Sequence, residues 1–171
     1  MTGLTLLVGF VPLLWISASY DDTRRSWWRM FGWATLAFVL WNLMTIWWIW
    51  FATPVGPAAA TLASTTMNMI AFMLFHTVSK KAPKALAYVT LVTAWIATEY
   101  WYTVGDFSWP WLVLGNGFSH EIWAVQWYEY TGVFGGTLWV LLANILIFEA
   151  LRARSARRWI AAACAVALPA A

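Results

Sequence analysis

The fold of this chain is decided by residues 30–79, which read MFGWATLAFVLWNLMTIWWIWFATPVGPAAATLASTTMNMIAFMLFHTVS. This stretch contains no Asp, Glu, Lys or Arg, and the turn-forming sequence Thr53-Pro54-Val55-Gly56-Pro57 divides it near the middle. An α-helix needs about 20 predominantly apolar residues to cross a bilayer. The stretch therefore predicts two transmembrane helices, at about 30–52 and 58–79.

Uncharged runs on both sides of this stretch predict four further helices, at about 3–19, 85–104, 131–151 and 159–171. The first contains Pro12, which predicts a kink. The last is shorter than a span requires and is predicted to be a truncated sixth helix. We therefore expect an all-α integral membrane protein, a bundle of five transmembrane helices plus this truncated one, with one long loop at residues 105–130.

The composition supports a lipid environment. The chain is 63% hydrophobic and only 10% charged, whereas a soluble domain carries about 25% charged residues. Its 16 tryptophans are typical of a protein whose rings gather at membrane interfaces. The net charge of +3 does not indicate a nucleic-acid partner, because membrane topology explains the basic residues. A single cysteine, Cys164, excludes an internal disulfide and a CxxC metal site.

The ten basic residues occupy three short clusters. They are Arg24, Arg25, Arg29, Lys80, Lys81, Lys84, Arg152, Arg154, Arg157 and Arg158. Short loops that carry Lys and Arg remain cytoplasmic, so the basic loops are predicted to be cytoplasmic and the N-terminus and loop 105–130 to lie on the opposite face. A cleaved signal peptide ending near Ser17-Ala18-Ser19 is excluded, because no basic segment precedes the apolar run and arginines follow it.

Glu99 is the one acid inside an apolar helix near the extracytoplasmic face. Burying a carboxylate in a membrane is costly, and such a residue is by default a candidate functional site. The alternative is a structural carboxyl that hydrogen-bonds across the bundle to Asn42, Asn68 or a tryptophan N–H. The residues alone leave both interpretations open.

The long loop supplies the second candidate, the segment from Trp109 to Gly117. Pro110 stiffens the backbone between the indoles of Trp109 and Trp111, and Gly115 permits a tight turn. Such a loop can dip into the headgroup layer and hold a lipid chain or a lipidated partner. An ordinary aromatic belt at the interface is the alternative, and it is also the preferred interpretation of Trp47-Trp48-Ile49-Trp50.

Other motifs indicate packing or are incomplete. Gly132 and Gly136 form a GxxxG pattern, which predicts close helix packing within the bundle in preference to a dimer interface. By the predicted topology, His76 and His120 lie on opposite sides of the membrane and cannot share a metal. Cys164 lies in an apolar run, where a thiol is usually inert. We therefore expect no metal, no cofactor and no catalytic residue in this chain.

Several segments together resemble the membrane domain of bacterial apolipoprotein N-acyltransferase. The most specific are Thr98-Glu99-Tyr100-Trp101, Trp109-Pro110-Trp111-Leu112, Leu114-Gly115 and the run from Gln126 to Gly136 followed by Asn144. Gly9-Phe10-Val11-Pro12-Leu13-Leu14-Trp15, Trp41-Asn42 and Trp47-Trp48-Ile49-Trp50 also fit, in the manner of Bacteroidetes-type members. The resemblance covers essentially the whole chain, and its specific part is residues 98–136.

The resemblance implies a reaction and a place for it. The family transfers an acyl chain from a phospholipid to the α-amino group of the diacylglyceryl-cysteine at a lipoprotein's N-terminus, through a thioester on its own cysteine. The implied location is the bacterial inner membrane, with chemistry at the periplasmic face. The implied partners are a phospholipid acyl donor and a lipidated apolipoprotein acceptor. Glu99, Trp109, Pro110, Trp111 and Gly115 become candidates for lipid or substrate binding, because they match the family's acid and aromatic-Pro-Trp loop.

The sequence departs from the family pattern in one respect. The family's catalytic Glu, Lys and Cys lie on a nitrilase-like domain, and residues matching that domain are absent from this sequence. We therefore expect a truncated membrane domain that is monomeric and inactive by itself. The alternative is a free-standing small membrane protein acting as a scaffold or transporter. A transporter should show more intramembrane ionisable residues or an internal repeat, and neither is evident.

Overall fold

The computed structural model describes residues 3–104, 108 and 110–167. Within these residues every regular element is a helix, which confirms the all-α prediction. The chain divides into two compact units: Ser17–Thr98 forms one, and the segments Met1–Ile16 and Glu99–Ala171 form the other. Among the described residues, three helices are long and apolar enough to cross a membrane, and they span Arg24–Phe51, Gly56–Lys81 and Tyr128–Ala153. The predicted total of five spans and a truncated sixth stays a prediction.

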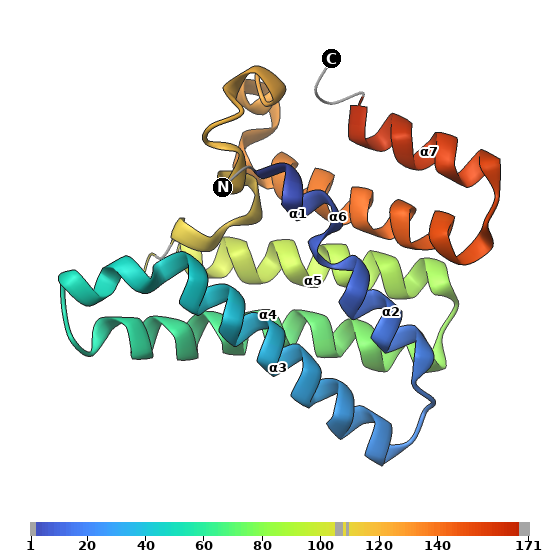
Figure 1. The fold of residues 1–171 in the computed structure, drawn as a ribbon, viewed down its shortest axis with the longest axis horizontal. Coiled ribbons are helices and arrows are strands. Elements are labelled where there is room, and N and C mark those ends of the chain that lie inside the picture. The colour runs from blue at the N-terminus through green and yellow to red at the C-terminus, as the bar shows by residue number, and fades with distance from the viewer. Residues whose placement is uncertain (1–2, 105–107, 109, 168–171) are drawn as a thin grey trace. The chain divides into compact units, whose positions relative to one another are not determined.

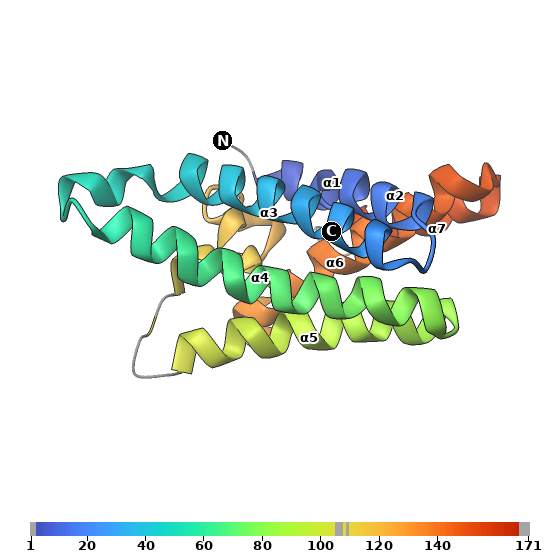
Figure 2. The same ribbon diagram turned by 90° about the horizontal axis from the view of Figure 1, so that it is seen from below.

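The unit Ser17–Thr98 is built on a helical hairpin followed by a third helix (Figure 1). Its elements are α3 (Arg24–Ile46), the 3₁₀ helix η2 (Trp47–Phe51), α4 (Gly56–Lys81) and the greater part of α5 (Lys84–Val104). Aromatic rings fill the space between them: Phe38 packs against Trp95 at 5.7 Å and Phe75 stacks on Tyr88 at 6.2 Å between ring centroids. Figure 2 shows α5 returning beside α4.

Helix α3 begins at Arg24, six residues before the start predicted near residue 30. The Thr23 hydroxyl accepts a hydrogen bond from the backbone N–H of Ser26 at 3.2 Å, so a side-chain cap starts the helix within the charged segment. The hydroxyl of Ser26 also donates to Asp21, and this bond, with a further one from Thr23, lowers the pKa of the exposed Asp21 carboxyl below its ordinary value. The apolar content of the sequence does not predict this start, because the first turn of α3 carries arginines.

Polar contacts join two basic segments at one end of this unit. The Lys80 ammonium donates to the backbone carbonyls of Ser17 at 2.6 Å and Tyr20 at 2.8 Å, where helix α2 (Val11–Ser19) ends. A cation at a helix C-terminus is favourable because the last carbonyls lack intrahelical partners. Ser17 and His76 are also buried together, with Oγ and Nδ1 2.8 Å apart. The clusters at 24–29 and 80–84 therefore share one end of the unit.

The second unit begins with a broken helix. Its elements are η1 (Gly3–Thr5), α1 (Leu6–Gly9) and the first part of α2, and the break falls at Phe10, next to the kink predicted at Pro12. Asn144 satisfies the backbone at this break: its Oδ1 accepts from Phe10 N–H at 2.8 Å, and its Nδ2 donates to Leu6 O at 2.7 Å. Broken helices are tolerated in membranes where such partners replace the lost backbone bonds.

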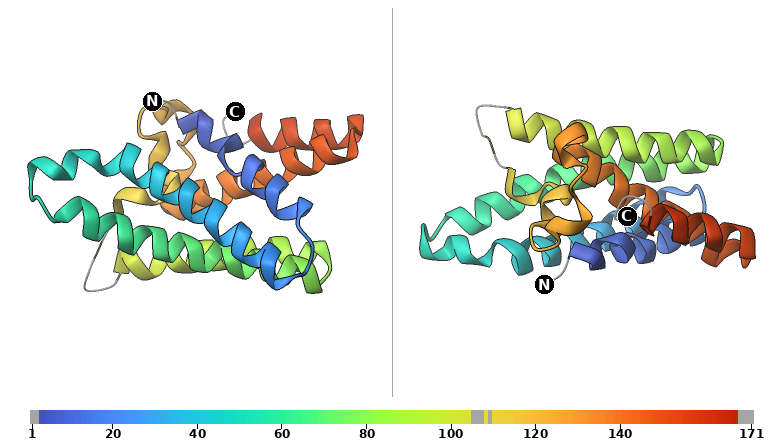
Figure 3. Two further views of the ribbon diagram at one scale, coloured as in Figure 1. Left: turned by 60° about the horizontal axis from the view of Figure 1, so that its bottom comes forward. Right: turned by 90° about the horizontal axis from the view of Figure 1, so that it is seen from above.

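The rest of this unit consists of a hairpin and a compact loop. Helix α6 (Tyr128–Ala153) is followed by α7 (Ala156–Ala167), and the chain reverses at Arg154, whose φ of 48° is left-handed. Figure 3 shows α7 lying along α6, where the Trp139 indole donates to Ala165 O at 2.8 Å. The described part of the segment predicted as one long loop, residues 105–130, contains three short 3₁₀ helices, η3 (Pro110–Leu112), η4 (Leu114–Phe118) and η5 (Ile122–Ala124).

Candidate functional site

Glu99 fixes the compact loop to helix α6. Its side chain is 0% exposed. One carboxyl oxygen accepts a hydrogen bond from the backbone N–H of Leu114 at 2.9 Å, and the other accepts from the Thr137 hydroxyl at 2.6 Å. The Thr137 oxygen in turn accepts from Gly115 N–H at 3.3 Å. The last part of α5, the loop and helix α6 are thus joined through one buried carboxyl group.

Gly115 lies against the backbone of α6 so closely that no side chain fits. A Cβ at this position would overlap the carbonyl oxygen of Val133. On the facing helix, a Cβ at Gly136 would meet the Tyr128 hydroxyl and would lie 2.9 Å from the Gly115 Cα. The Tyr128 hydroxyl also donates to Gly115 O at 3.0 Å. The loop and α6 therefore meet backbone to backbone.

This contact corrects the interpretation of the GxxxG pattern. Gly136 packs against the loop at Gly115, whereas Gly132 has φ of 65°, interrupts the regular geometry of α6 and has no atom near its missing side chain. The two glycines therefore do not form one helix-packing face. Gly132 is a kink at the start of the helix, and a left-handed φ favours glycine there because other residues pay a steric cost.

A second buried acid stabilises the other end of the loop. Glu121 accepts a hydrogen bond from Gly3 N–H at 3.3 Å, and a Cβ on Gly3 would overlap the carbonyl oxygen of Gly117. The Phe118 ring stacks on the Trp139 indole, with centroids 4.8 Å apart. The loop is therefore held at both ends and through its centre by contacts within the protein.

The aromatic-Pro-Trp segment lies at the surface of this loop. Pro110 begins η3, and its carbonyl accepts from the Asn116 amide at 2.7 Å. Trp111 is 61% exposed on this short 3₁₀ helix, so its ring lies at the surface. Trp109, the predicted partner of Trp111, lies outside the described residues. The structure therefore brings Glu99 and Gly115 together in the interior and leaves Pro110 and Trp111 at the surface.

Glu99 lies in the interior and holds the loop against the rest of its unit. Both of its oxygens are engaged with protein donors, and the side chain has no surface through which to touch a substrate. The hydrogen bonds that the structure describes go to Leu114 and Thr137, and the sequence suggests neither as a partner. Thr137 was missed because a threonine in an apolar helix usually bonds its own backbone, and only the loop's position gives it another role.

The described residues contain no group of three His, Cys, Asp or Glu side chains that could hold a metal. Cys164, on α7, is exposed and free.

Over the part of the chain that the structure describes, these features define an all-helical protein with helices suited to cross a bilayer and an aromatic loop packed against one of them. The chain belongs to the family of the apolipoprotein N-acyltransferase N-terminal domain, whose family model matches residues 2–146. The match includes Glu99, the loop, Thr137 and Asn144, and it ends before α7.

A curated relative supports the same assignment. The chain is 30% identical over 145 residues to the apolipoprotein N-acyltransferase of Chlorobaculum tepidum, and the alignment covers 82% of this chain. It covers 26% of the relative, so the chain spans about a quarter of that protein's length. No solved structure matches the chain.

Proposed function

We propose that this chain is the membrane domain of an apolipoprotein N-acyltransferase, positioned in the bacterial inner membrane with loop 105–130 at the periplasmic face. The whole enzyme would move a fatty acyl chain from a phospholipid to the N-terminal diacylglyceryl-cysteine of a lipoprotein. The observation that carries the proposal is the family match over residues 2–146. The rigid loop, with Trp111 exposed upon it, supports a role in positioning lipid.

In this proposal the chain binds and orients acyl chains and takes no covalent part in the reaction. The catalytic Glu, Lys and Cys would lie on a nitrilase-like domain outside this sequence. Within the chain, Glu99 and Thr137 hold the loop that carries Trp111 against α6. A ring fixed in advance binds with a smaller entropic cost than one on a mobile loop.

The proposal is tested with the complete reading frame that contains this chain, expressed in a bacterium depleted of its own apolipoprotein N-acyltransferase. Mass spectrometry of lipoprotein N-terminal peptides should show a third acyl chain. Lipoproteins that keep only two acyl chains, despite normal amounts of the protein in the membrane, would contradict the proposed function.

The loop is tested separately in the same strain. Trp111→Ala should lower the rate of acyl transfer about tenfold, equivalent to about 1.4 kcal/mol of binding free energy, with the protein level unchanged. The matched control is Trp101→Ala, because Trp101 is 64% exposed on α5 in the same unit and should not affect the rate. Equal activity of both variants and the wild type would assign the loop to an ordinary aromatic belt.

A further inference from the structure

The polar seam between helices α3 and α4, formed by Asn42, Thr61, Thr65 and Asn68, holds polar groups that the protein itself leaves unpaired. Among the described residues, the buried side-chain nitrogen and oxygen atoms without a hydrogen-bond partner are Asn42 Oδ1, Thr61 Oγ1 and Asn68 Nδ2. Asn42 lies on α3, and the other two lie on α4. Leaving a buried polar group unpaired is costly, so three such atoms in one seam point to a partner outside the chain.

A contact with α3 shows which face of α4 borders the seam. The Thr65 hydroxyl accepts a hydrogen bond from Asn42 Nδ2 at 3.3 Å. Thr61 lies four residues before Thr65 and Asn68 lies three residues after it, a spacing that places all three on one face of the helix. Side chains at such positions are about 5–6 Å apart between Cβ atoms, and polar groups at this separation are commonly bridged by water.

The Asn42 amide can adopt only one orientation. Its Nδ2 donates to Phe38 O at 2.7 Å as well as to Thr65, and an exchange of the amide oxygen and nitrogen would set two carbonyl oxygens against each other. The unpaired atom on α3 is therefore an acceptor, whereas the unpaired Nδ2 of Asn68 on α4 is a donor. A water molecule donates and accepts at the same time, so it can satisfy both groups.

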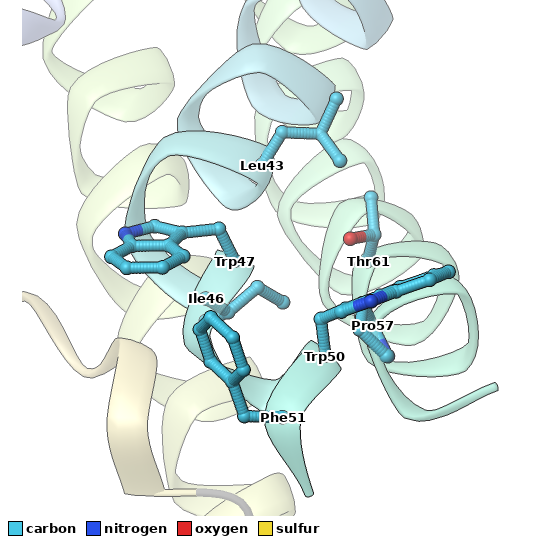
Figure 4. A pocket seen from close by; sticks show the side chains of 7 residues that line it. All are labelled: Leu43, Ile46, Trp47, Trp50, Phe51, Pro57 and Thr61. Carbon is cyan, nitrogen blue, oxygen red and sulfur yellow. The ribbon is translucent and has the colours of Figure 1, made fainter. Parts of the chain in front are cut away.

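Thr61 extends the seam to the hairpin tip, where residues 52–55 join η2 to α4. Thr66 and Thr77 on the same helix donate to the carbonyl four residues earlier, but the Thr61 hydroxyl is unpaired. Thr61 also borders an apolar pocket at the tip, and Figure 4 shows its oxygen turned toward the α3 side. The hydroxyl therefore points toward the helix that carries Asn42.

The seam has an open end and a closed end. Thr61 lies five residues after Gly56, where α4 begins, which is about 8 Å along the helix. The headgroup layer on each side of a bilayer is about 5–8 Å thick, so with the tip at the membrane surface Thr61 is within reach of its water. Asn68 lies about 10 Å further along α4. One turn beyond it the buried rings of Phe38 and Phe72 pack 5.9 Å apart between centroids and close the seam.

We propose that the α3–α4 seam binds a short file of ordered water molecules that links Thr61, Asn42 and Asn68. At the inner end, a water molecule donates to Asn42 Oδ1 and accepts from Asn68 Nδ2. At the outer end, another accepts from the Thr61 hydroxyl. The ligand is water because the groups it meets are neutral, and residues 30–79 contain no Asp, Glu, Lys or Arg that could balance the charge of an ion.

The four asparagines of the chain are matched reporters of this water. Asn42 and Asn144 are both 0% exposed and Asn68 is 3% exposed, so burial alone predicts the same behaviour for all three. The oxygen and both N–H groups of Asn144 are hydrogen-bonded within the protein, which makes it the dry reference. Asn116 is exposed and is the wet reference.

The first test uses the full chain, isotope-labelled at its asparagine side-chain nitrogens, in vesicles of phosphatidylethanolamine and phosphatidylglycerol. Solid-state NMR measures the transfer of polarisation from water to each side-chain amide, and Asn68→Leu identifies the Asn68 signal. Transfer to Asn68 should be about threefold or more faster than to Asn144 and close to that of Asn116, because Asn68 is bonded directly to water. Equal rates at Asn68 and Asn144 would overturn the proposal.

A variant on the facing helix tests whether the two amides share one water molecule. Asn42→Leu removes the acceptor of the inner water, so transfer to Asn68 should fall about threefold or more. Unchanged rates at Asn116 and Asn144 report that the variant keeps its fold. Thr66→Val is the control, because the Thr66 hydroxyl is exposed and bonds its own helix. If Asn42→Leu leaves transfer to Asn68 unchanged, the amides share no water.

A double-mutant cycle supplies a second measurement that needs no water signal. The unfolding equilibrium constant is measured in detergent for Asn42→Leu, Asn68→Leu and the double variant. A shared bridge should make the effect of the double variant differ about two- to tenfold from the product of the single effects, the range of one net hydrogen bond. The same cycle with Thr66→Val in place of Asn42→Leu should give a simple product. A simple product for Asn42 and Asn68 would refute the bridge.

Discussion

Glu99 is an unusual residue because a single carboxyl group supplies acceptors to two different elements. Replacing it with Ala leaves the Leu114 N–H and the Thr137 hydroxyl without their acceptors in a buried site. Leaving a buried donor without its acceptor costs about 1–3 kcal/mol, so Glu99→Ala should lower the free energy of unfolding by about 2 kcal/mol or more. Glu99→Gln should cost less, because its amide oxygen still accepts from Leu114.

The measurement combines unfolding in detergent with limited proteolysis of the loop. Glu99→Ala should make peptide bonds between residues 110 and 127 accessible at protease concentrations that leave the wild type intact. Glu129→Ala is the control, since Glu129 is an exposed acid in the same unit. If the loop of the Glu99→Ala variant resists proteolysis as well as the wild-type loop, the carboxyl does not hold it.

Gly115 tests the backbone contact between loop and helix. In Gly115→Ala the new Cβ would overlap the Val133 carbonyl oxygen, so the loop must move away from α6. Overpacking of this kind costs about 1–3 kcal/mol, and the melting temperature should fall. Gly32→Ala provides the contrast: a Cβ there meets nothing within 4 Å, and replacing a helical glycine with alanine should stabilise α3 by about 0.5–1 kcal/mol. Equal effects of the two substitutions would disprove the close contact.

The candidate site could be predicted from the sequence only in part, and the reason lies in individual residues. Glu99 stands out because an acid in an apolar helix is costly wherever it is placed. Its partners could not be found in the same way, because Leu114 contributes a backbone N–H, which every residue except proline carries. Thr137 and Tyr128 acquire their roles from the path of the loop, which depends on tertiary packing and not on local pattern.

At the level of elements, Asn144 compensates for the break between α1 and α2. Its amide both accepts from Phe10 N–H and donates to Leu6 O, so Asn144→Leu removes both of these hydrogen bonds. We expect a loss of about 2–4 kcal/mol in unfolding free energy, together with faster hydrogen exchange at Phe10. Leu142→Ala, at an exposed position on the same helix, should change the exchange of Phe10 little. An unchanged exchange rate at Phe10 in Asn144→Leu would show that another group satisfies the break.

The elements also show where pattern-based prediction fails. The apolar runs located the helices, but helix α3 starts at Arg24 because the Thr23 side chain caps it. Charged residues in the first turn of a helix carry no hydrophobic signal, so the amphipathic pattern alone places the start too late. Likewise, the four-residue spacing of Gly132 and Gly136 does not distinguish two structures. In one, both glycines lie on a helix-packing face; in the other, Gly132 kinks the helix and only Gly136 makes a close contact. Only the φ angle of Gly132 distinguishes the two.

At the scale of the whole molecule, the basic residues gather at one end of the long helices in each of the two units. In Ser17–Thr98, Lys80 contacts the segment that precedes α3, so its two basic clusters share the end opposite the hairpin tip. In the other unit, the arginines from 152 to 158 lie at the far end of α6 from the compact loop. Helix α6 has 26 residues, about 39 Å at 1.5 Å per residue, which is sufficient to cross a bilayer. Each unit therefore has one basic end and one uncharged or aromatic end.

The positive-inside tendency then predicts the orientation of each unit independently. In a Cys164→Ala background, Val55→Cys at the hairpin tip and His120→Cys in the loop should react with a membrane-impermeant maleimide on spheroplasts. Ala85→Cys and Ala153→Cys, which lie beside the basic clusters at exposed positions, should react only after the membrane is opened. Labelling of Ala153→Cys from outside would place the loop in the cytoplasm and would remove the basis for assigning it to periplasmic lipid.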